Sequence, residues 1–331
     1  MDHIGWRRAT RCLGTFVLLV SGCGDGAKPA AEVRPIGQME TVPEAEAPAI
    51  SVAANDARTR APLDATPSPD GKRVYYLATT LDEQGEEFAG VFVVAADGGK
   101  GAQPETVSSG EPLVTPVGIT TSLDGNTLFV ADTAASSVFS VQSAGGSLSA
   151  LSGTEGYQPA GVTVARRQKE ERVFFTGHDP QSGAAGLFSL PASGGAAQVE
   201  ASGDLFEHPG GVVVSAKGDA FVVDMGQDNA RVLRVRDGKA EAFVSGIGVG
   251  FPAGITLTHD ESTLIVSGLD PNTKHDVVYF VEVASGKLSQ LTQVVGAFSE
   301  AAGLHRAHDT DVFAWADSRA NASGTVYLLK L

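Results

Sequence analysis

The chain has 331 residues, of which 42% are apolar and 19% are charged, and it carries a formal net charge of -15 at pH 7. So acidic a surface repels phosphate backbones and anionic headgroups, which argues against nucleic acid as a partner. Two cysteines, Cys12 and Cys23, are too few for a disulfide framework. The apolar content suffices for a large core, and 40 Gly and 16 Pro favour many short elements joined by turns.

The first 22 residues are predicted to be an export signal. A positively charged start, with Arg7, Arg8 and Arg11, precedes the apolar stretch Cys12–Val20. That stretch is too short to span a bilayer stably, which is typical of a signal peptide.

The segment Leu19–Cys23 (LVSGC) resembles the lipobox of bacterial lipoproteins. In that family the chain is cut before the cysteine, which then carries acyl chains. The resemblance implies a membrane anchor at Cys23, because two or more acyl chains hold a protein on a membrane stably. Gly24 in place of Asp after the cysteine implies the outer membrane of the bacterial cell envelope, facing the periplasm. An ordinary signal peptide with a cysteine near its end is the alternative.

Residues 23–48 are predicted to be the lipidated cysteine and a disordered tether. They are rich in Ala, Pro and Glu and lack apolar periodicity. A short helix over Met39–Glu46 is the alternative, but Pro43 and Pro48 interrupt it. The folded domain is therefore expected to begin at residue 49.

The rest of the chain repeats a Pro-x-Gly-[Ile/Val] signature with a period typical of propeller blades. Clear copies begin at Pro116, Pro159, Pro209 and Pro252. A degenerate copy is Ala301–Leu304, and an earlier one centres on Asp64, by its spacing from the turn Asp70-Gly71. The glycine positions of the six copies are then 64, 118, 161, 211, 254 and 303.

Each copy contains the same series of short segments: a strand after the glycine, a polar turn, a β-branched strand, a third strand after a variable loop, and a tight turn before a fourth strand. The second strands are expected at 73–78, 127–131, 172–176, 220–223, 263–267 and 311–316. Because this series recurs six times without helical periodicity, the sequence predicts an all-β fold, a six-bladed β-propeller of four-stranded antiparallel blades over residues 49–331. A β-sandwich would not explain the regular recurrence.

The two ends of the chain are expected to meet in one blade. The sixth copy ends at Leu331 after its third strand, which leaves an unpaired edge. Ala49–Asn55 precedes the first copy at about the distance that fourth strands keep from the next copy. We therefore expect this N-terminal strand to complete the sixth blade and to close the ring without a covalent bond.

Three motifs of the second copy resemble an NHL repeat: Pro116–Ile119, Asp124–Asn126 and Leu128–Thr133. Ala220–Asp224 and Phe313–Asp317 resemble its second strand, and the likeness extends over about residues 60–331. NHL-type propellers are mostly binding platforms. The resemblance thus implies a non-catalytic protein that binds a protein or a small ligand.

Gluconolactonase-like and paraoxonase-like propellers share the expected architecture and hold a divalent metal in the central channel through Asn, Asp or Glu. Here the residues between Pro and Gly of the signature, and the one in the sixth copy, offer no side-chain ligand: Val117, Ala160, Gly210, Ala253 and Ala302. The acids at inner positions are Asp64 and Glu300. The alternative function is therefore a metal-dependent hydrolase that uses these two acids and carboxylates of the loop rim to bind a cation such as calcium. Otherwise no cofactor is expected.

The loops between second and third strands carry most of the remaining polar groups, and the chain has no G-x-S-x-G or H-E-x-x-H motif. The candidate ligand-binding residues in these loops are Asp132, Asp224, Asp317, His178, Asp179 and Asp270. The first three recur at one position of the repeat and are expected nearest the channel. Besides ligand binding, the pattern also fits a solvated acidic rim, or aspartates that accept hydrogen bonds from loop backbone.

His305 and His308 lie three residues apart on an expected strand, so they point to opposite faces and are not expected to share a metal ion. Trp315 is expected to pack between blades. The sequence as a whole predicts a membrane-anchored, NHL-like propeller lipoprotein that binds an unidentified protein or small ligand at its loop face. A metal-dependent hydrolase of the gluconolactonase-like class is the alternative. The sequence does not distinguish the binding protein from a third possibility, a purely structural lipoprotein of the cell envelope.

Overall fold

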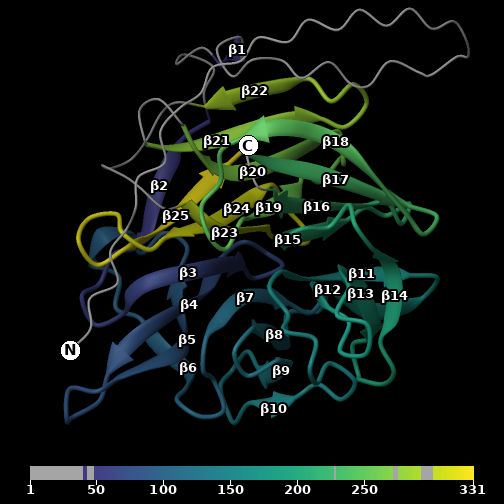
Figure 1. Cartoon of the computed structure of the whole chain (residues 1–331). Helices are drawn as coiled ribbons and strands as arrows, with labels where there is room; N and C mark the ends of the chain where they lie inside the picture. Colours follow the sequence, from purple (N-terminus) through teal and green to yellow (C-terminus); the bar gives the residue numbers. More distant parts are fainter. Residues whose placement is uncertain (1–39, 43–47, 227–228, 271–274, 292–300) are drawn as a thin grey trace, which may run out of the picture. The chain divides into compact units, whose positions relative to one another are not determined.

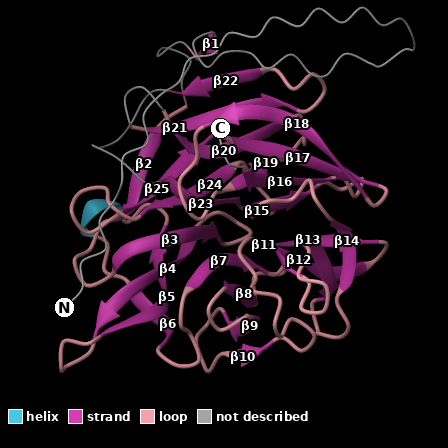
Figure 2. Ribbon diagram, in the orientation of Figure 1, coloured by secondary structure: helices cyan, strands magenta, loops and turns pink. Residues whose placement is uncertain are grey.

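The computed structural model describes residues 40–42, 48–226, 229–270, 275–291 and 301–331. The predicted signal peptide 1–22, the lipidation site Cys23 and Glu300 lie outside these residues, as does most of the predicted tether. Within them the regular structure is β-strand, apart from one turn of 3-10 helix at Gly99–Gly101 (Figures 1 and 2). No helix in the described ranges is long and apolar enough to cross a membrane.

Four of the sheets contain a series of antiparallel strands in chain order. The first comprises β7 (Pro116–Thr121), β8 (Thr127–Asp132), β9 (Ser137–Gln142) and β10 (Ser149–Ala150). The second comprises β11 (Val162–Arg167), β12 (Glu170–His178), β13 (Ala185–Pro191) and β14 (Gln198–Ser202). The third comprises β15 (Pro209–Val214), β16 (Ala220–Met225), β17 (Ala230–Arg236) and β18 (Lys239–Ile247). The fourth comprises β19 (Ile255–Leu257), β20 (Thr263–Leu269), β21 (Asp276–Glu282) and β22 (Leu288–Leu291), with β1 (Glu40–Thr41) added in parallel to β22.

The remaining strands form one sheet of eight, in the order β2-β25-β24-β23-β3-β4-β5-β6. One half is β3 (Arg60–Pro67), β4 (Arg73–Leu81), β5 (Glu87–Ala95) and β6 (Glu105–Ser109). The other is β23 (Ala301–Arg306), β24 (Val312–Asp317), β25 (Thr325–Lys330) and β2 (Ile50–Ala54). We number the four-strand series as units in chain order: unit one is β3–β6, units two to five are the sheets above without β1, and unit six is β23–β25 with β2.

The all-β prediction is confirmed, but the described strands form five hydrogen-bonded sheets where six separate blades are expected. The difference arises where unit six meets unit one. There β23 and β3 pair in parallel, with Gly303 opposite Asp64 and Leu304 opposite Ala65. Gly303 allows this approach because an added Cβ would overlap the Asp64 side chain.

The core consists of clusters that lie between consecutive units. Tyr75 of unit one packs with Ile119 and Leu128 of unit two, for example. Such packing on both faces explains why the second strands are continuous apolar runs rather than alternating ones. Ala65 of unit one packs with Leu328 of unit six, so the last unit contacts the first.

The closing strand is confirmed. β2 pairs antiparallel with β25, with Ile50 opposite Leu329 and Val52 opposite Tyr327. The Asn55 amide then donates to Gly324 O at 2.6 Å. The N-terminal strand therefore holds the last unit by main-chain hydrogen bonds, in place of a covalent link.

Part of the predicted tether has regular structure. Glu40–Thr41 forms β1 on the outer edge of β22, where Val42 N donates to Gln290 O at 3.1 Å. Glu40 also forms an ion pair with Lys287, with 2.7 Å between Nζ and Oε2. A disordered segment is thus the wrong interpretation for residues 40–42.

Trp315 packs where it is expected to. It is 3% exposed and stacks on Tyr327 with 5.4 Å between ring centroids. Both belong to a cluster with Ile265 and Val278 of unit five. The indole therefore lies between units five and six and is a probe of their packing.

Candidate functional site

The inner strands approach one another at the glycine position of the repeat. A Cβ added to Gly118 would lie 2.6 Å from Ala160 O, and one added to Gly161 or Gly211 would overlap the next inner strand. Glycine recurs there because a neighbouring backbone occupies the space of a side chain. The cavity that these strands leave at the centre measures only about 10 Å³, close to the smallest space that holds one water molecule.

Asp64 stands where the other copies carry glycine, and it joins three inner strands. The residue is 2% exposed. Oδ1 accepts from Ala65 N at 2.7 Å, and Oδ2 accepts from Ile119 N of β7 at 2.7 Å. The same Oδ2 lies 3.1 Å from His305 Nε2 of β23. Asp64 is therefore a structural link between units six, one and two.

His305 and His308 have separate partners. His308 Nε2 donates to Thr121 O of β7 at 3.1 Å, whereas His305 contacts Asp64. Between them, Arg306 Nε donates to Leu257 O of β19 at 2.8 Å. The two imidazoles therefore contact different strands, His305 β3 and His308 β7.

The pH dependence of stability follows in part from His308. Burial lowers the pKa of His308 below its ordinary value of 6.5, so the unfolded chain binds a proton at a higher pH than the folded protein does. The stability that the neutral imidazole contributes is complete above about pH 6.5 and is lost as the pH falls from there through the folded pKa. We expect His308→Gln, whose amide can donate to Thr121 O, to flatten this part of the pH profile in urea melts between pH 7 and 5. An unchanged profile would contradict the assignment.

Asp64 is the acid among the described residues that line the central cavity, and its carboxylate is already engaged. Both carboxylate oxygens of Asp64 accept hydrogen bonds from backbone amides. In the described part of the chain, no group of three or more His, Cys, Asp or Glu is placed to hold a metal ion. Glu300, the second acid predicted for this role, lies outside the described residues. The geometry thus offers one carboxylate that is already engaged.

The recurring aspartates Asp132, Asp224 and Asp317 are buried, each with 0% exposure. Asp132 accepts from Val114 N, Thr115 N and Ala135 N at 2.7 to 3.1 Å. Asp317 accepts from Arg319 N and Ala320 N, both at 2.8 Å. A place on an open rim is therefore wrong for these side chains, because their carboxylates bind backbone amides before the first strand or after the second strand of their units.

Asp224 has the same position and an additional partner. It accepts from Glu207 N and His208 N, at 2.9 and 3.0 Å. Its second oxygen pairs with Arg231, whose Nη2 lies 2.7 Å away. This buried pair neutralises the carboxylate, so a ligand would have to displace an arginine to reach it.

The other three loop candidates do not form a shared site in the described structure. Asp179 Oδ1 accepts from Gln181 N and Ser182 N, and these backbone hydrogen bonds lower the pKa of Asp179. His178 N donates to Tyr157 O at 2.7 Å. Asp270 N donates to His275 O at 2.9 Å. His178 and Asp179 thus belong to unit three, and Asp270 to unit five.

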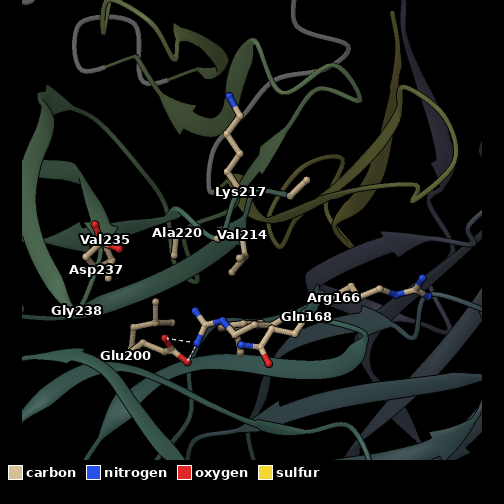
Figure 3. Close-up of a pocket in the computed structure, with 14 residues that line it drawn as sticks. Arg166, Gln168, Glu200, Val214, Lys217, Ala220, Val235, Asp237 and Gly238 are labelled. Atoms are coloured by element: carbon tan, nitrogen blue, oxygen red, sulfur yellow. Dashed lines mark hydrogen bonds and ion pairs between the residues drawn. The ribbon is translucent and has the colours of Figure 1, made fainter.

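A larger hollow lies elsewhere, between units three and four. This groove has a volume of about 470 Å³ and is lined by the hairpins that join the first two strands of each unit, by β14 and by the turn between β17 and β18 (Figure 3). Its volume falls within the range of small-molecule sites.

The junction at the groove differs from three others in its contacts. At those three, a carboxylate of the next unit accepts from the turn after the first strand: Glu171 from Leu123 N, Glu261 from Ala216 N, and Asp311 from His259 N. Asp219 of unit four instead pairs with Arg236 of its own unit. The β11–β12 hairpin also pairs as far as Arg167 and Glu170, so it extends beyond the level of the other hairpins.

One wall of the groove holds an ion pair over an aromatic ring. Arg167 Nη1 lies 2.6 and 2.8 Å from the two carboxylate oxygens of Glu200, drawn as dashed lines in Figure 3. The guanidinium carbon of Arg167 lies 5.2 Å from the centre of the Phe174 ring. Leu187, Val214 and Val235 add apolar surface. The groove thus combines a cation with an apolar wall.

Sequence reasoning missed this groove. Two signals were available: the Arg166-Arg167 pair in an acidic chain, and the turn Gln168-Lys169, which replaces the Asp-Gly type of turn seen in the second copy. Neither shows that Asp219 pairs within its own unit, since that depends on side-chain contacts in the fold.

Comparison with known proteins identifies the fold. No protein-family model and no curated protein matches the chain. Among solved structures, a gluconolactonase from Xanthomonas campestris is 15% identical with a TM-score of 0.61, covering 88% of this chain and 94% of that one. The PQQ-bound aldose sugar dehydrogenase from Streptomyces coelicolor is 13% identical with a TM-score of 0.59, covering 86% of this chain and 99% of that one. A chain of a nidogen–laminin complex is 18% identical with a TM-score of 0.55, covering 71% of this chain and 81% of that one.

These similarities show the fold alone. The chain is an all-β propeller with a distant structural resemblance to gluconolactonase-like propellers. Structures of this fold include a gluconolactonase, an aldose sugar dehydrogenase and a chain of a nidogen–laminin complex, so the function has to be argued from the residues of this chain.

Proposed function

We propose that this protein is a binding propeller rather than an enzyme, which holds a small ligand in the groove between units three and four. The observation that carries the proposal is the closed centre: backbone fills the positions where a channel site would need side chains, and a cavity of about 10 Å³ is left. The groove of about 470 Å³ is the larger space. The predicted loop-face residues do not enter the proposal, since Asp132, Asp224 and Asp317 bind loop backbone.

The proposal includes six blades of the NHL-like type. The eight-stranded sheet then counts as two blades, because each half is a complete antiparallel series with its own inner strand. Asp64 and Gly303 occupy the repeat's glycine position in these two halves. The short parallel pairing of β23 with β3 is the seam between them.

A metal-dependent hydrolase of the gluconolactonase-like class is the second candidate function. The observation in its favour is that Asp64 and His305 line the same central cavity. It would need a divalent cation to displace the amide of Ile119 from Asp64 and further ligands beyond those described.

A hydrolysis assay separates the two. We expect the mature protein to leave sugar lactones and aryl esters unhydrolysed in calcium, manganese or zinc, because no metal-bound water is generated at the centre. The assay follows proton release and nitrophenolate absorbance, with a metal-dependent lactonase as the positive control. Metal-dependent turnover that disappears in Asp64→Ala would establish the hydrolase and overturn the binding proposal.

The membrane anchor is also part of the proposal, on the strength of the LVSGC motif at residues 19–23. We expect the expressed protein to fractionate with bacterial outer membranes and to carry an acyl mass on Cys23. Cys23→Ala is expected to remain uncleaved or to be released from the membrane fraction, since one hydrophobic segment of nine residues does not anchor stably. Equal membrane recovery of both proteins after alkaline washing would contradict lipidation.

A further inference from the structure

We propose that the groove between units three and four binds a small organic carboxylate, whose carboxylate is held by Arg167 and whose apolar body lies against Val214 on the opposite side of the groove. This inference rests on the proposed function and names the ligand class of that site. It follows from the way Arg167 is paired, the charges around it and the shape of its surroundings.

Arg167 keeps its best carboxylate-binding edge free. The Nε/Nη2 edge of a guanidinium matches a carboxylate with two parallel hydrogen bonds. The protein uses that edge for the carboxylate partners of Arg58, Arg231, Arg234 and Arg236. Arg167 instead contacts Glu200 through Nη1, and its Nε and Nη2 have no partner among the described residues.

The Arg167 side chain is held ready for a ligand. Glu200, whose side chain is 12% exposed, also accepts from Ser189 Oγ, so the carboxylate that orients Arg167 is itself fixed. Phe174 lies under the guanidinium. The Arg167 side chain is 38% exposed, which leaves the group accessible from the groove. An arginine fixed in this way loses little conformational entropy when an anion binds.

The surrounding charges favour an anion near Arg167. Arg166 and Lys217 line the groove as well, and neither has an ion-pair partner among the described residues. Figure 3 shows both side chains extending away from Glu200, so they act as rim charges rather than as direct ligands. Asp237 also lines the groove, and Figure 3 shows its carboxylate turned away from that of Glu200.

The apolar wall defines the rest of the ligand. Phe174, Leu187, Ala220 and Val235 are buried residues that contribute to the lining. Val214 is partly exposed in the groove, and a carboxylate with a ring or a short alkyl chain covers this side chain, whereas a free inorganic anion leaves it in water. The chemistry therefore favours a carboxylate with an apolar body over phosphate.

Isothermal titration of the mature protein with benzoate tests the inference, with benzamide and inorganic phosphate as comparison probes. We expect benzoate to bind with a Kd on the order of 1 mM or tighter, as suits a ligand of this size, and benzamide and phosphate to bind at least tenfold more weakly. Arg167→Lys keeps the positive charge but removes the Nε/Nη2 edge that donates two parallel hydrogen bonds. We expect it to weaken benzoate binding at least tenfold.

A matched control is available in Arg234→Lys. Arg234 also pairs with a glutamate, Glu241, and stacks on an aromatic ring, Phe243, at 5.2 Å, but its Nε/Nη2 edge is occupied. We expect Arg234→Lys to change the Kd by less than twofold. Val214→Phe adds a ring to the groove and leaves Arg167 itself unchanged. It keeps the test decisive should Arg167→Lys fold poorly, and is also expected to abolish binding.

The outcomes separate this inference from the function it rests on. Absence of benzoate binding, equal binding of phosphate, or equal losses in Arg167→Lys and Arg234→Lys would overturn the carboxylate site. None of these results bears on the hydrolysis assay, so a protein without lactonase activity would keep its proposed binding function with another ligand.

Discussion

Asp64→Asn is expected to destabilise the protein by about 2–4 kcal/mol, the range found when a buried charged hydrogen-bonding group loses its partners. An asparagine offers one carbonyl oxygen and one amide donor. If its oxygen faces Ile119 N, its NH2 group faces Ala65 N, and the reverse orientation leaves Ile119 N against a donor. One buried donor therefore stays without an acceptor in either case. For a domain of this size the melting midpoint should fall by roughly 5–15 °C.

The control for Asp64→Asn is Asp204→Asn, an exposed aspartate without a side-chain contact in the described structure. It makes the same change of charge, and we expect its midpoint to stay within about 1 °C of the wild type because surface substitutions have small effects. Urea melts that give the two variants equal stability would show that Asp64 does not join the inner strands as described.

Removal of β2 is the second change with a large expected effect. A chain that begins at Asp56 loses the partner of β25, and with it the burial of Val52, Ala53 and Ala54. Hydrophobic burial of this extent contributes about 3–6 kcal/mol, so the midpoint should fall by on the order of 10 °C. The bare edge of β25 should also promote association between molecules.

Two longer chains isolate the contribution of β2. A chain that begins at Pro48 lacks β1 but keeps β2, and one that begins at Glu40 keeps both. We expect these two to melt within about 3 °C of each other, since β1 adds only a two-residue exposed strand to β22. Light scattering and circular dichroism follow association and unfolding. Equal midpoints for the chains that begin at Pro48 and Asp56 would refute closure by β2.

Sequence reasoning predicted the strands well because their signals are local. The apolar run 127–131 is observed as β8 over Thr127–Asp132, and the run 263–267 is observed as β20 over Thr263–Leu269. The recurring glycine marks positions where a neighbouring backbone leaves no room for a side chain, as at Gly118. Such a constraint acts on one residue of each repeat, so it appears directly in the sequence.

The candidate site was less accessible to the sequence because it depends on which side chains pair. Asp64 departs from the glycine pattern, which suggested a metal ligand, but its partners Ile119 and His305 lie 55 and 241 positions away. Asp132 illustrates the opposite case. The repeat alone allowed a role in binding loop backbone, and the contacts of Asp132 with Val114 N and Thr115 N agree with that role.

The groove also depends on distant contacts. Asp219 occupies a turn like those of Glu261 and Asp311, yet it pairs with Arg236 rather than with the preceding unit. The residue types alone do not decide whether this carboxylate pairs within its unit or with the preceding one. The β11–β12 hairpin is longer than the others, so Arg167 rather than a backbone amide of the turn faces unit four.

The proposed binding function predicts that the centre of the propeller holds no catalytic metal. A thermal melt of the mature protein tests it most directly, followed by the fluorescence of Trp315, with calcium or zinc compared against a chelator. A specific site at a hundredfold excess of metal over Kd would add about 2.7 kcal/mol of stability, which corresponds to roughly 5–10 °C. We predict the same midpoint, within about 1 °C, in every condition. A rise of several degrees that is lost in Asp64→Ala would contradict the account and place a metal at the centre.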